Sequence, residues 1–324
     1  MKHTLTLLAV FALFLESNPQ VGATSYTYTP ISVLGSELTW ATGINDSGQV
    51  VGRYRDPIYG DRGFLYANGS YTTILYPGSV GTITWGINNS GDIVGLWGDG
   101  QGVGRAFVRD GTTGAYSSFS FPGAIFTQAL GINNAGSIVG LYIDSKNQYH
   151  GFLKTGDSFT SIDVYGASYT DAWKINDSGQ IVGRYGSPDQ GYLYSAGSFS
   201  AVMPQHFAWA YGINNSGNIV GLYVDTNGDH GFVKVGNTFI PIDYPGNTGV
   251  TAAYDINNYG SIVGWYTDPT AGERGFLATP VPLPGDFGPA DCDVDGSDLA
   301  VLIANTSLMD LTTFAENFGE NDCP

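Results

Sequence analysis

Gly86-Ile87-Asn88-Asn89-Ser90-Gly91-Asp92-Ile93-Val94-Gly95 is the stretch that decides the fold, because its pattern occurs six times along the chain. The copies begin at Gly43, Gly86, Gly131, Lys174, Gly212 and Asp255, and their Ile residues lie 43, 45, 43, 38 and 43 residues apart. A period of this length holds four short strands with their turns, which is what one blade of a β-propeller requires. The repeat therefore predicts one blade per copy.

The unit around Gly86 shows where the strands of a blade should lie. Residues 82–88, 92–97, 105–109 and 116–121 are rich in β-branched or aromatic side chains and predict four strands. Asn89-Ser90-Gly91 forms the first turn, and Pro122-Gly123 ends the outer strand. The simplest interpretation of each copy is purely structural: a buried Ile and the residues of a tight turn.

The two ends of the repeat region predict how the ring closes. Residues 26–35 resemble the fourth strand of a unit whose first three strands are missing, and the sixth unit stops after its third strand at Gly275-Phe276-Leu277. The N-terminal strand should therefore complete the last blade and remove both exposed sheet edges. We expect an all-β, six-bladed propeller over residues 24–279.

Composition limits the classes of partner. Only 13% of the 324 residues are charged, about half of the usual share of ~25%. The net charge of −17 disfavours nucleic acid and anionic membrane surfaces, because both would be repelled. Calcium and neutral partners such as sugars suit this charge better.

The N-terminus has the pattern of a secretory signal peptide over residues 1–23. Lys2 precedes the apolar run from Leu5 to Leu15, and Val21-Gly22-Ala23 supplies small residues for cleavage. No later stretch approaches the 18 apolar residues of a membrane span. We expect a soluble, monomeric mature chain that is secreted or held at the cell surface.

The units resemble the extracellular HAF-type repeats, which are named for a His-Ala-Phe triplet. The resemblance rests on the whole unit, since none of the triplets here is His-Ala-Phe itself. It implies a secreted or surface protein and lends no catalytic residues. The matching triplets are Arg62-Gly63-Phe64, Arg105-Ala106-Phe107, His150-Gly151-Phe152, Gln190-Gly191-Tyr192, His230-Gly231-Phe232 and Arg274-Gly275-Phe276.

Five units share an aromatic residue, then an Asp two positions later, then a basic residue. The fourth unit loses acid and base together at Ser187 and Gln190, which indicates a charge pair across a hairpin. The alternative is ligand binding in repeated pockets between blades, because aromatic faces beside Asp and Arg commonly hold sugars. The candidate ligand-binding residues are Tyr54, Asp56, Arg62, Trp97, Asp99, Arg105, Tyr142, Asp144, His150, Tyr223, Asp225, His230, Tyr266, Asp268 and Arg274.

No catalytic residue can be named from the sequence. It contains no G-x-S-x-G, no H-E-x-x-H and no phosphate-binding loop. The favoured function is a non-catalytic extracellular platform that binds a polysaccharide or a protein. Two alternatives stay open: a polysaccharide-degrading enzyme with acidic residues at the propeller mouth, and a purely structural surface protein.

A second module is predicted over residues 286–324, after a Pro-rich linker at 280–285. Asp291, Asp293, Asp295 and Asp298 lie within eight residues, and such a cluster suits a hard cation with oxygen ligands. The loop resembles the calcium loop of a dockerin, the module that binds cohesin in cellulosome-type assemblies. Two helix-like segments, at 298–305 and 310–317, echo the dockerin's duplicated halves, although no second acidic loop precedes Asp310. The resemblance implies a small helical calcium module and a cohesin-like receptor.

The only two cysteines, Cys292 and Cys323, both belong to this tail. In an oxidising compartment they predict one disulfide that closes the module. The alternatives are two free thiols and, for the aspartates, an acidic surface turn that binds no metal.

Overall fold

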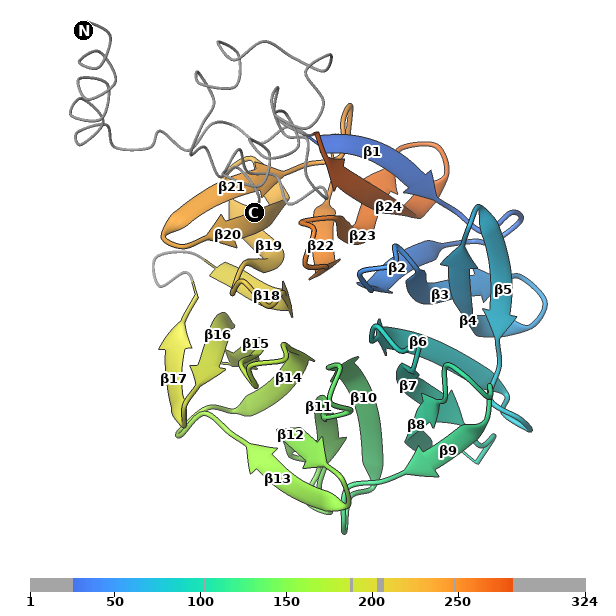
Figure 1. The fold of residues 1–324 in the computed structure, drawn as a ribbon, viewed down its shortest axis with the longest axis vertical. Coiled ribbons are helices and arrows are strands. Elements are labelled where there is room, and N and C mark those ends of the chain that lie inside the picture. The colour runs from blue at the N-terminus through green and yellow to red at the C-terminus, as the bar shows by residue number, and fades with distance from the viewer. Residues whose placement is uncertain (1–25, 102, 187–188, 203–206, 248, 282–324) are drawn as a thin grey trace, which may run out of the picture. The chain divides into compact units, whose positions relative to one another are not determined.

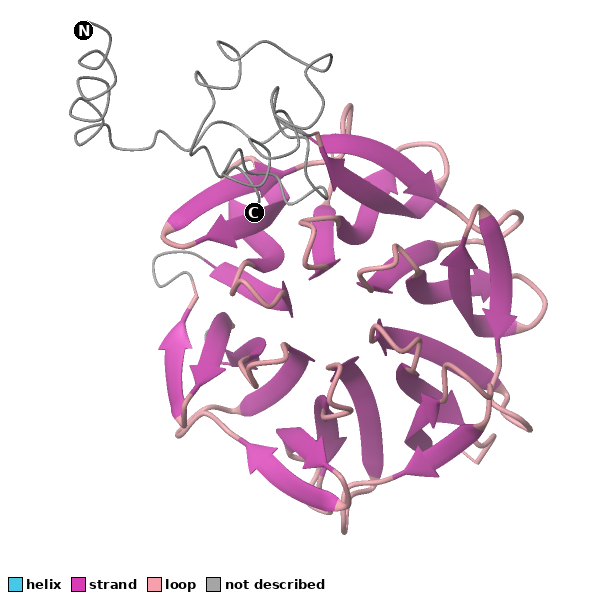
Figure 2. Ribbon diagram, viewed as in Figure 1, coloured by secondary structure: helices cyan, strands magenta, loops and turns pink. Residues whose placement is uncertain are grey.

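Six sheets of four antiparallel strands surround a common axis (Figures 1 and 2). The computed structural model describes residues 26–101, 103–186, 189–202, 207–247 and 249–281. These residues form strands and turns and contain no helix, so the prediction of an all-β, six-bladed propeller is confirmed. The signal peptide, the acidic loop, both cysteines and the helical module lie outside the described residues and stay predictions.

Each blade uses one copy of the repeat, and its first strand lies nearest the axis. Blade 1 contains β2 (Thr39–Ile44), β3 (Val50–Asp56), β4 (Gly60–Ala67) and β5 (Ser70–Ile74). Blade 2 contains β6 (Gly81–Ile87), β7 (Ile93–Gly98), β8 (Gly104–Arg109) and β9 (Tyr116–Phe119), and blade 3 contains β10 (Phe126–Ile132), β11 (Ile138–Ile143), β12 (Tyr149–Thr155) and β13 (Ser158–Ile162). Blade 4 contains β14 (Tyr169–Ile175), β15 (Ile181–Gly186), β16 (Gln190–Ser195) and β17 (Ser198–Ala201), and blade 5 contains β18 (Phe207–Ile213), β19 (Ile219–Asp225), β20 (Gly228–Val235) and β21 (Thr238–Ile242).

Blade 6 closes the ring as the sequence predicts. It contains β22 (Thr251–Ile256), β23 (Ile262–Asp268) and β24 (Gly272–Pro280), and its outer strand is β1 (Tyr26–Ile31) from the other end of the propeller. The pairing of β1 with β24 runs from Tyr26 opposite Pro280 to Ile31 opposite Gly275. Figure 1 shows the blue β1 beside the red-brown β24.

The repeated residues form the core and the turns. The aromatic residue of every triplet is fully buried, and the Ile of every copy is buried at the end of its inner strand. Glycine is required where blades approach each other at the axis: a Cβ on Gly131 would lie 2.7 Å from the carbonyl oxygen of Trp173 in the next blade. Gly91 of the first turn has a φ of 79°, the conformation that a hairpin turn of this kind requires.

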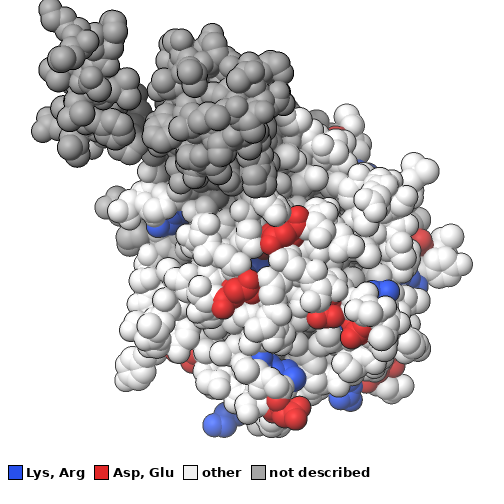
Figure 3. All heavy atoms as spheres, viewed as in Figure 1, with Lys and Arg blue, Asp and Glu red and all other residues white. Residues whose placement is uncertain are grey.

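The face drawn in Figure 3 is largely uncharged, with acidic and basic side chains scattered over it in small groups. Within the described residues, no helix is long and apolar enough to cross a membrane.

Candidate functional site

The five predicted sets of aromatic, acidic and basic residues each come together at one hairpin, between the second and third strands of a blade. In blade 1, Tyr54 of β3 lies directly opposite Arg62 of β4, and Asp56 ends β3. The same cross-strand pairing joins Trp97 to Arg105, Tyr142 to His150, Tyr223 to His230 and Tyr266 to Arg274. The spacing in the sequence thus corresponds to real proximity.

The aspartates of these sets hold the hairpin turns. Asp56 Oδ1 accepts hydrogen bonds from the backbone N–H groups of Ile58 and Tyr59, at 2.8 and 2.9 Å. Asp144 and Asp268 accept equivalent bonds within their own turns. These bonds favour the ionised carboxylate and keep the pKa of Asp56 and of Asp144 below the ordinary value. Turn capping is therefore the common role of these aspartates.

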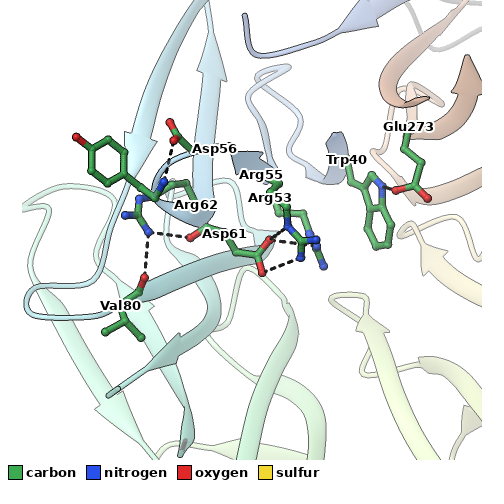
Figure 4. Close-up of polar contacts among 9 residues, drawn as sticks. Trp40, Arg53, Arg55, Asp56, Asp61, Arg62, Val80 and Glu273 are labelled. Carbon is green, nitrogen blue, oxygen red and sulfur yellow. Dashed lines mark hydrogen bonds and ion pairs between the residues drawn. The ribbon is translucent and has the colours of Figure 1, made fainter. Parts of the chain in front are cut away.

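The basic residues behave in two ways. Arg105 lies 3.9 Å from Asp99, His150 lies 3.7 Å from Asp144 and His230 lies 3.5 Å from Asp225, so the predicted charge pair forms in these three blades. Arg62 and Arg274 instead donate to backbone carbonyl oxygens at the start of the next blade, those of Val80 and Glu37 (Arg62 in Figure 4). In blades 1 and 6 the charge pair is therefore not a direct contact, although the positive charges of Arg62 and Arg274 still help to lower the pKa of Asp56 and of Asp268.

The aromatic rings of the sets are packed between blade segments. Tyr142 stacks on Phe121 with ring centres 3.7 Å apart, and on its other partner, His150, at 4.9 Å. Trp97 stacks on Tyr76, and Tyr266 stacks on Tyr244. These stacks cover ring faces of Trp97, Tyr142 and Tyr266 that a sugar would need. Ligand binding by the five sets stays a prediction.

One cleft does open between blades 3 and 4. Its volume is about 280 Å³, just below the usual range of roughly 300–1,000 Å³ for small-molecule sites, so it has room for a small ligand. Its wall includes His150 and Asp163 from blade 3 and three tyrosines: Tyr149, Tyr165 and Tyr169. Tyr165 is fully exposed and Tyr149 is half exposed.

The polar groups of this cleft are fixed by hydrogen bonds. The His150 Nδ1 and Asp163 Oδ1 atoms are 3.0 Å apart, while Nε2 of the same ring faces Asp144. The Tyr169 hydroxyl donates to Asp189 at 2.6 Å, and burial together with this carboxylate raises the pKa of Tyr169. The cleft therefore offers preordered imidazole and carboxylate groups beside aromatic rings.

Asp163 was missed by the sequence analysis, although a signal for it exists. Asp163 follows His150 by thirteen residues, and Asp243 follows His230 by the same number. The Asp243 carboxylate likewise lies 2.9 Å from His230 Nδ1. In the Arg-bearing blades, the strand register places Leu75, Ser120 and Ser32 at the position equivalent to Asp163, so the acid accompanies histidine alone.

A closed double ring of hydrogen bonds surrounds one end of the axis. The first Asn of every copy donates from Nδ2 to the backbone carbonyl of its counterpart in the next blade, at 3.0–3.3 Å. The residue that follows donates its backbone N–H to the side chain of its own counterpart, at 2.8–2.9 Å. These residues line a cavity of about 70 Å³ together with Lys174 and Asp255.

Lys174 and Asp255 form an ion pair close to the propeller axis. They replace the first glycine of the repeat in blades 4 and 6, and the Lys174 Nζ atom lies 2.9 Å from Asp255 Oδ2. Nζ also donates to the carbonyl oxygens of Thr42 and Trp85, both at 2.9 Å. Burial raises the pKa of Asp255 despite this partner. The sequence shows both substitutions, but not that they meet.

Tryptophans form a packed cluster close to this pair, as the contact of Lys174 with the Trp85 carbonyl shows. Five of the six in the chain belong to one cluster, namely Trp40, Trp85, Trp173, Trp209 and Trp265. Figure 4 shows Trp40 donating to Glu273 near Arg53, which shares Asp61 with Arg55. Packed rings and hydrogen-bonded charged groups therefore occupy this region, and we take the cleft between blades 3 and 4 as the candidate site.

Comparison with known proteins supports the fold. No protein-family model matches the sequence, and no curated protein is similar to it. Among solved structures, the propeller is similar to the β-propeller domain of the Trilobed protease from Pyrococcus furiosus, with a TM-score of 0.51, 10% identity and coverage of 79% of this chain and 83% of that one. TolB from Acinetobacter baumannii gives a TM-score of 0.53 at 12% identity, over 72% of this chain and 64% of that one. A variant of the Aleuria aurantia lectin in complex with Fucalpha1-6GlcNAc gives 0.48 at 14% identity, over 78% and 98%.

At these identities the similarity concerns the fold alone. Within the described residues, no group of three or more His, Cys, Asp or Glu side chains could hold a metal ion.

Proposed function

We propose that the propeller is a non-catalytic carbohydrate-binding module and that the cleft between blades 3 and 4 is its binding site. The observation that carries this proposal is the presence of Tyr149, Tyr165 and Tyr169 around a cavity that also holds the His150–Asp163 pair. Aromatic rings pack against the apolar faces of sugars, and a few fixed polar groups orient the hydroxyls.

The chemistry of the pair fits binding better than cleavage. Glycoside hydrolysis uses two carboxyl groups, of which one protonates the leaving group while the other acts on the sugar ring. Asp163 and Asp144 both face the His150 ring, and Asp144 also caps its turn. The same carboxylates are thus held by structural contacts, which suits a fixed recognition surface.

The experiment is retention of the full chain on a panel of soluble and insoluble polysaccharides, with reducing ends assayed in the same tubes. Retention without new reducing ends is the expected result. Release of reducing ends would make the protein a hydrolase. Absence of retention on every polysaccharide would remove the carbohydrate proposal and favour a protein ligand.

The proposal also covers the two ends of the chain, residues 1–23 and 286–324. We propose that residues 1–23 direct secretion, that Asp291, Asp293, Asp295 and Asp298 bind calcium, and that Cys292 and Cys323 form a disulfide; a cohesin-like receptor would then bind this module. The support is the sequence pattern. Calcium titration of the full chain should show one site that is lost in the Asp293→Asn/Asp295→Asn variant, and unchanged affinity there would contradict the ligand assignment.

A further inference from the structure

The charged groups around the cleft are mainly acidic. The described residues that line it include Asp163 and His150 but neither lysine nor arginine. Two further carboxylates contact the lining residues, since Asp144 lies 3.7 Å from His150 and Asp189 accepts the Tyr169 hydroxyl. Arg184 lies 5.7 Å from the Tyr169 ring, but Asp171 neutralises it at 2.8 Å. Two carboxylates, Asp144 and Asp163, therefore face the imidazole of His150, and a third, Asp189, faces Tyr169.

Asp163 is the carboxylate that a ligand could reach. Its side chain is 40% exposed, and His150 engages its Oδ1 atom. Asp144 is more enclosed and also accepts backbone N–H groups of its turn. A ligand ammonium group would gain a charge-assisted hydrogen bond from Asp163, whereas a ligand carboxylate would be repelled.

We infer that the cleft prefers sugars with a protonated amino group over their acetylated counterparts and over uronic acids, and that Asp163 sets this preference. The inference rests on the proposed function of the same cleft. The whole chain adds to the effect, because its net charge of −17 attracts cationic ligands and repels anionic ones.

Calorimetric titration of the full chain tests this inference with three probes: a glucosamine oligomer, an N-acetylglucosamine oligomer of the same length, and a galacturonic acid oligomer. The wild type should bind the amino form up to about fivefold more tightly than the acetylated form, as expected for a partly exposed ion pair, and the uronate most weakly. The Asp163→Asn variant should lose most of this preference, and an unchanged preference would overturn the role of Asp163.

Blade 5 supplies the matched control. Asp243 contacts His230 in the same geometry and with a similar exposure of 42%, but it does not line the cleft. The Asp243→Asn variant should therefore keep the wild-type preference. Loss of the preference in both variants would indicate a general charge effect and overturn the role of Asp163.

The remaining outcomes separate the two proposals. Equal wild-type binding of the amino and acetylated oligomers, weakened in both cases by Tyr165→Ala, would overturn the charge preference and leave the cleft as a sugar site. Failure to bind the glucosamine oligomer would overturn the preference even if another sugar is retained. Failure to retain any polysaccharide would remove the proposed function as well.

Discussion

Lys174 and Asp255 stand where the other four copies of the repeat carry glycine. Each is buried, and the pair bridges blades 4 and 6 at the axis. A buried charge without its partner is far more costly than the absence of both charges. These two residues therefore depend on each other, and the losses of unfolding free energy from their single substitutions should not add up in the double variant.

The Lys174→Gly variant should lose about 3–5 kcal/mol of unfolding free energy, because Asp255 is left buried without a counter-ion. The Lys174→Gly/Asp255→Gly variant restores the repeat and should lose clearly less. Chemical denaturation of both variants, with Asp255→Gly beside them, measures the coupling. Additive losses would show that the two charges do not interact as described.

Asp163 shows why part of the site was missed in the sequence. The hairpin sets lie within about ten residues of each other, so their spacing predicted proximity, and the structure brings them together. The contact of Asp163 with His150 joins the outer strand to the third strand, and the register of that pairing is fixed only by the fold. Comparison of the six units position by position could have revealed it.

The hairpin turns predict a response to acid. The pKa values of Asp56, Asp144, Asp225 and Asp268 lie below 3.8 in the folded protein, mainly because turn groups donate hydrogen bonds to them. The folded state thus binds these protons less readily than the unfolded state. The stability from the caps is present above pH 3.8 and is lost as the pH falls through the lowered pKa values.

Burial acts in the opposite sense at Asp171 and Asp255, whose raised pKa values favour the protonated folded state. Asp56→Asn keeps an acceptor in the turn but cannot titrate, whereas the buried acids are the same in this variant and in the wild type. Lowering the pH from about 5 to about 2.5 should therefore destabilise the wild type more than Asp56→Asn, as measured by the denaturation midpoint. An identical pH dependence of the two proteins would contradict the capping role.

The closing strand gives a direct test of the blade assignment. Ile31 of β1 lies opposite Gly275 and is fully buried, as Ile74 of β5 lies opposite Gly63 in blade 1. Ile31→Ala and Ile74→Ala should therefore each cost about 2–5 kcal/mol of unfolding free energy. A neutral Ile31→Ala beside a costly Ile74→Ala would show that β1 does not complete blade 6 in solution.

The architecture of the whole propeller could be predicted because it follows from the repeat alone. Periodicity predicted six blades, and the unpaired first strand predicted the closure that β1 and β24 form. The hydrogen bonds between blades at the axis were not predictable, because they join residues of six blades that lie about 43 positions apart in the sequence. The double ring of Asn and Asp contacts is therefore a property of the closed ring, not of any single unit.

The cleft between blades 3 and 4 is the carbohydrate-binding site that we propose. Leu34 offers a matched control, because it precedes the turn glycine Gly35 as Tyr165 precedes Gly166, and both side chains are fully exposed. The most direct measurement compares the affinities of Tyr165→Ala, Leu34→Ala and the wild type for a polysaccharide that the full chain retains. We predict that Tyr165→Ala binds about tenfold more weakly, since it removes an aromatic contact, while Leu34→Ala binds like the wild type. Equal affinities for all three proteins would contradict the claim and place the site elsewhere on the molecule.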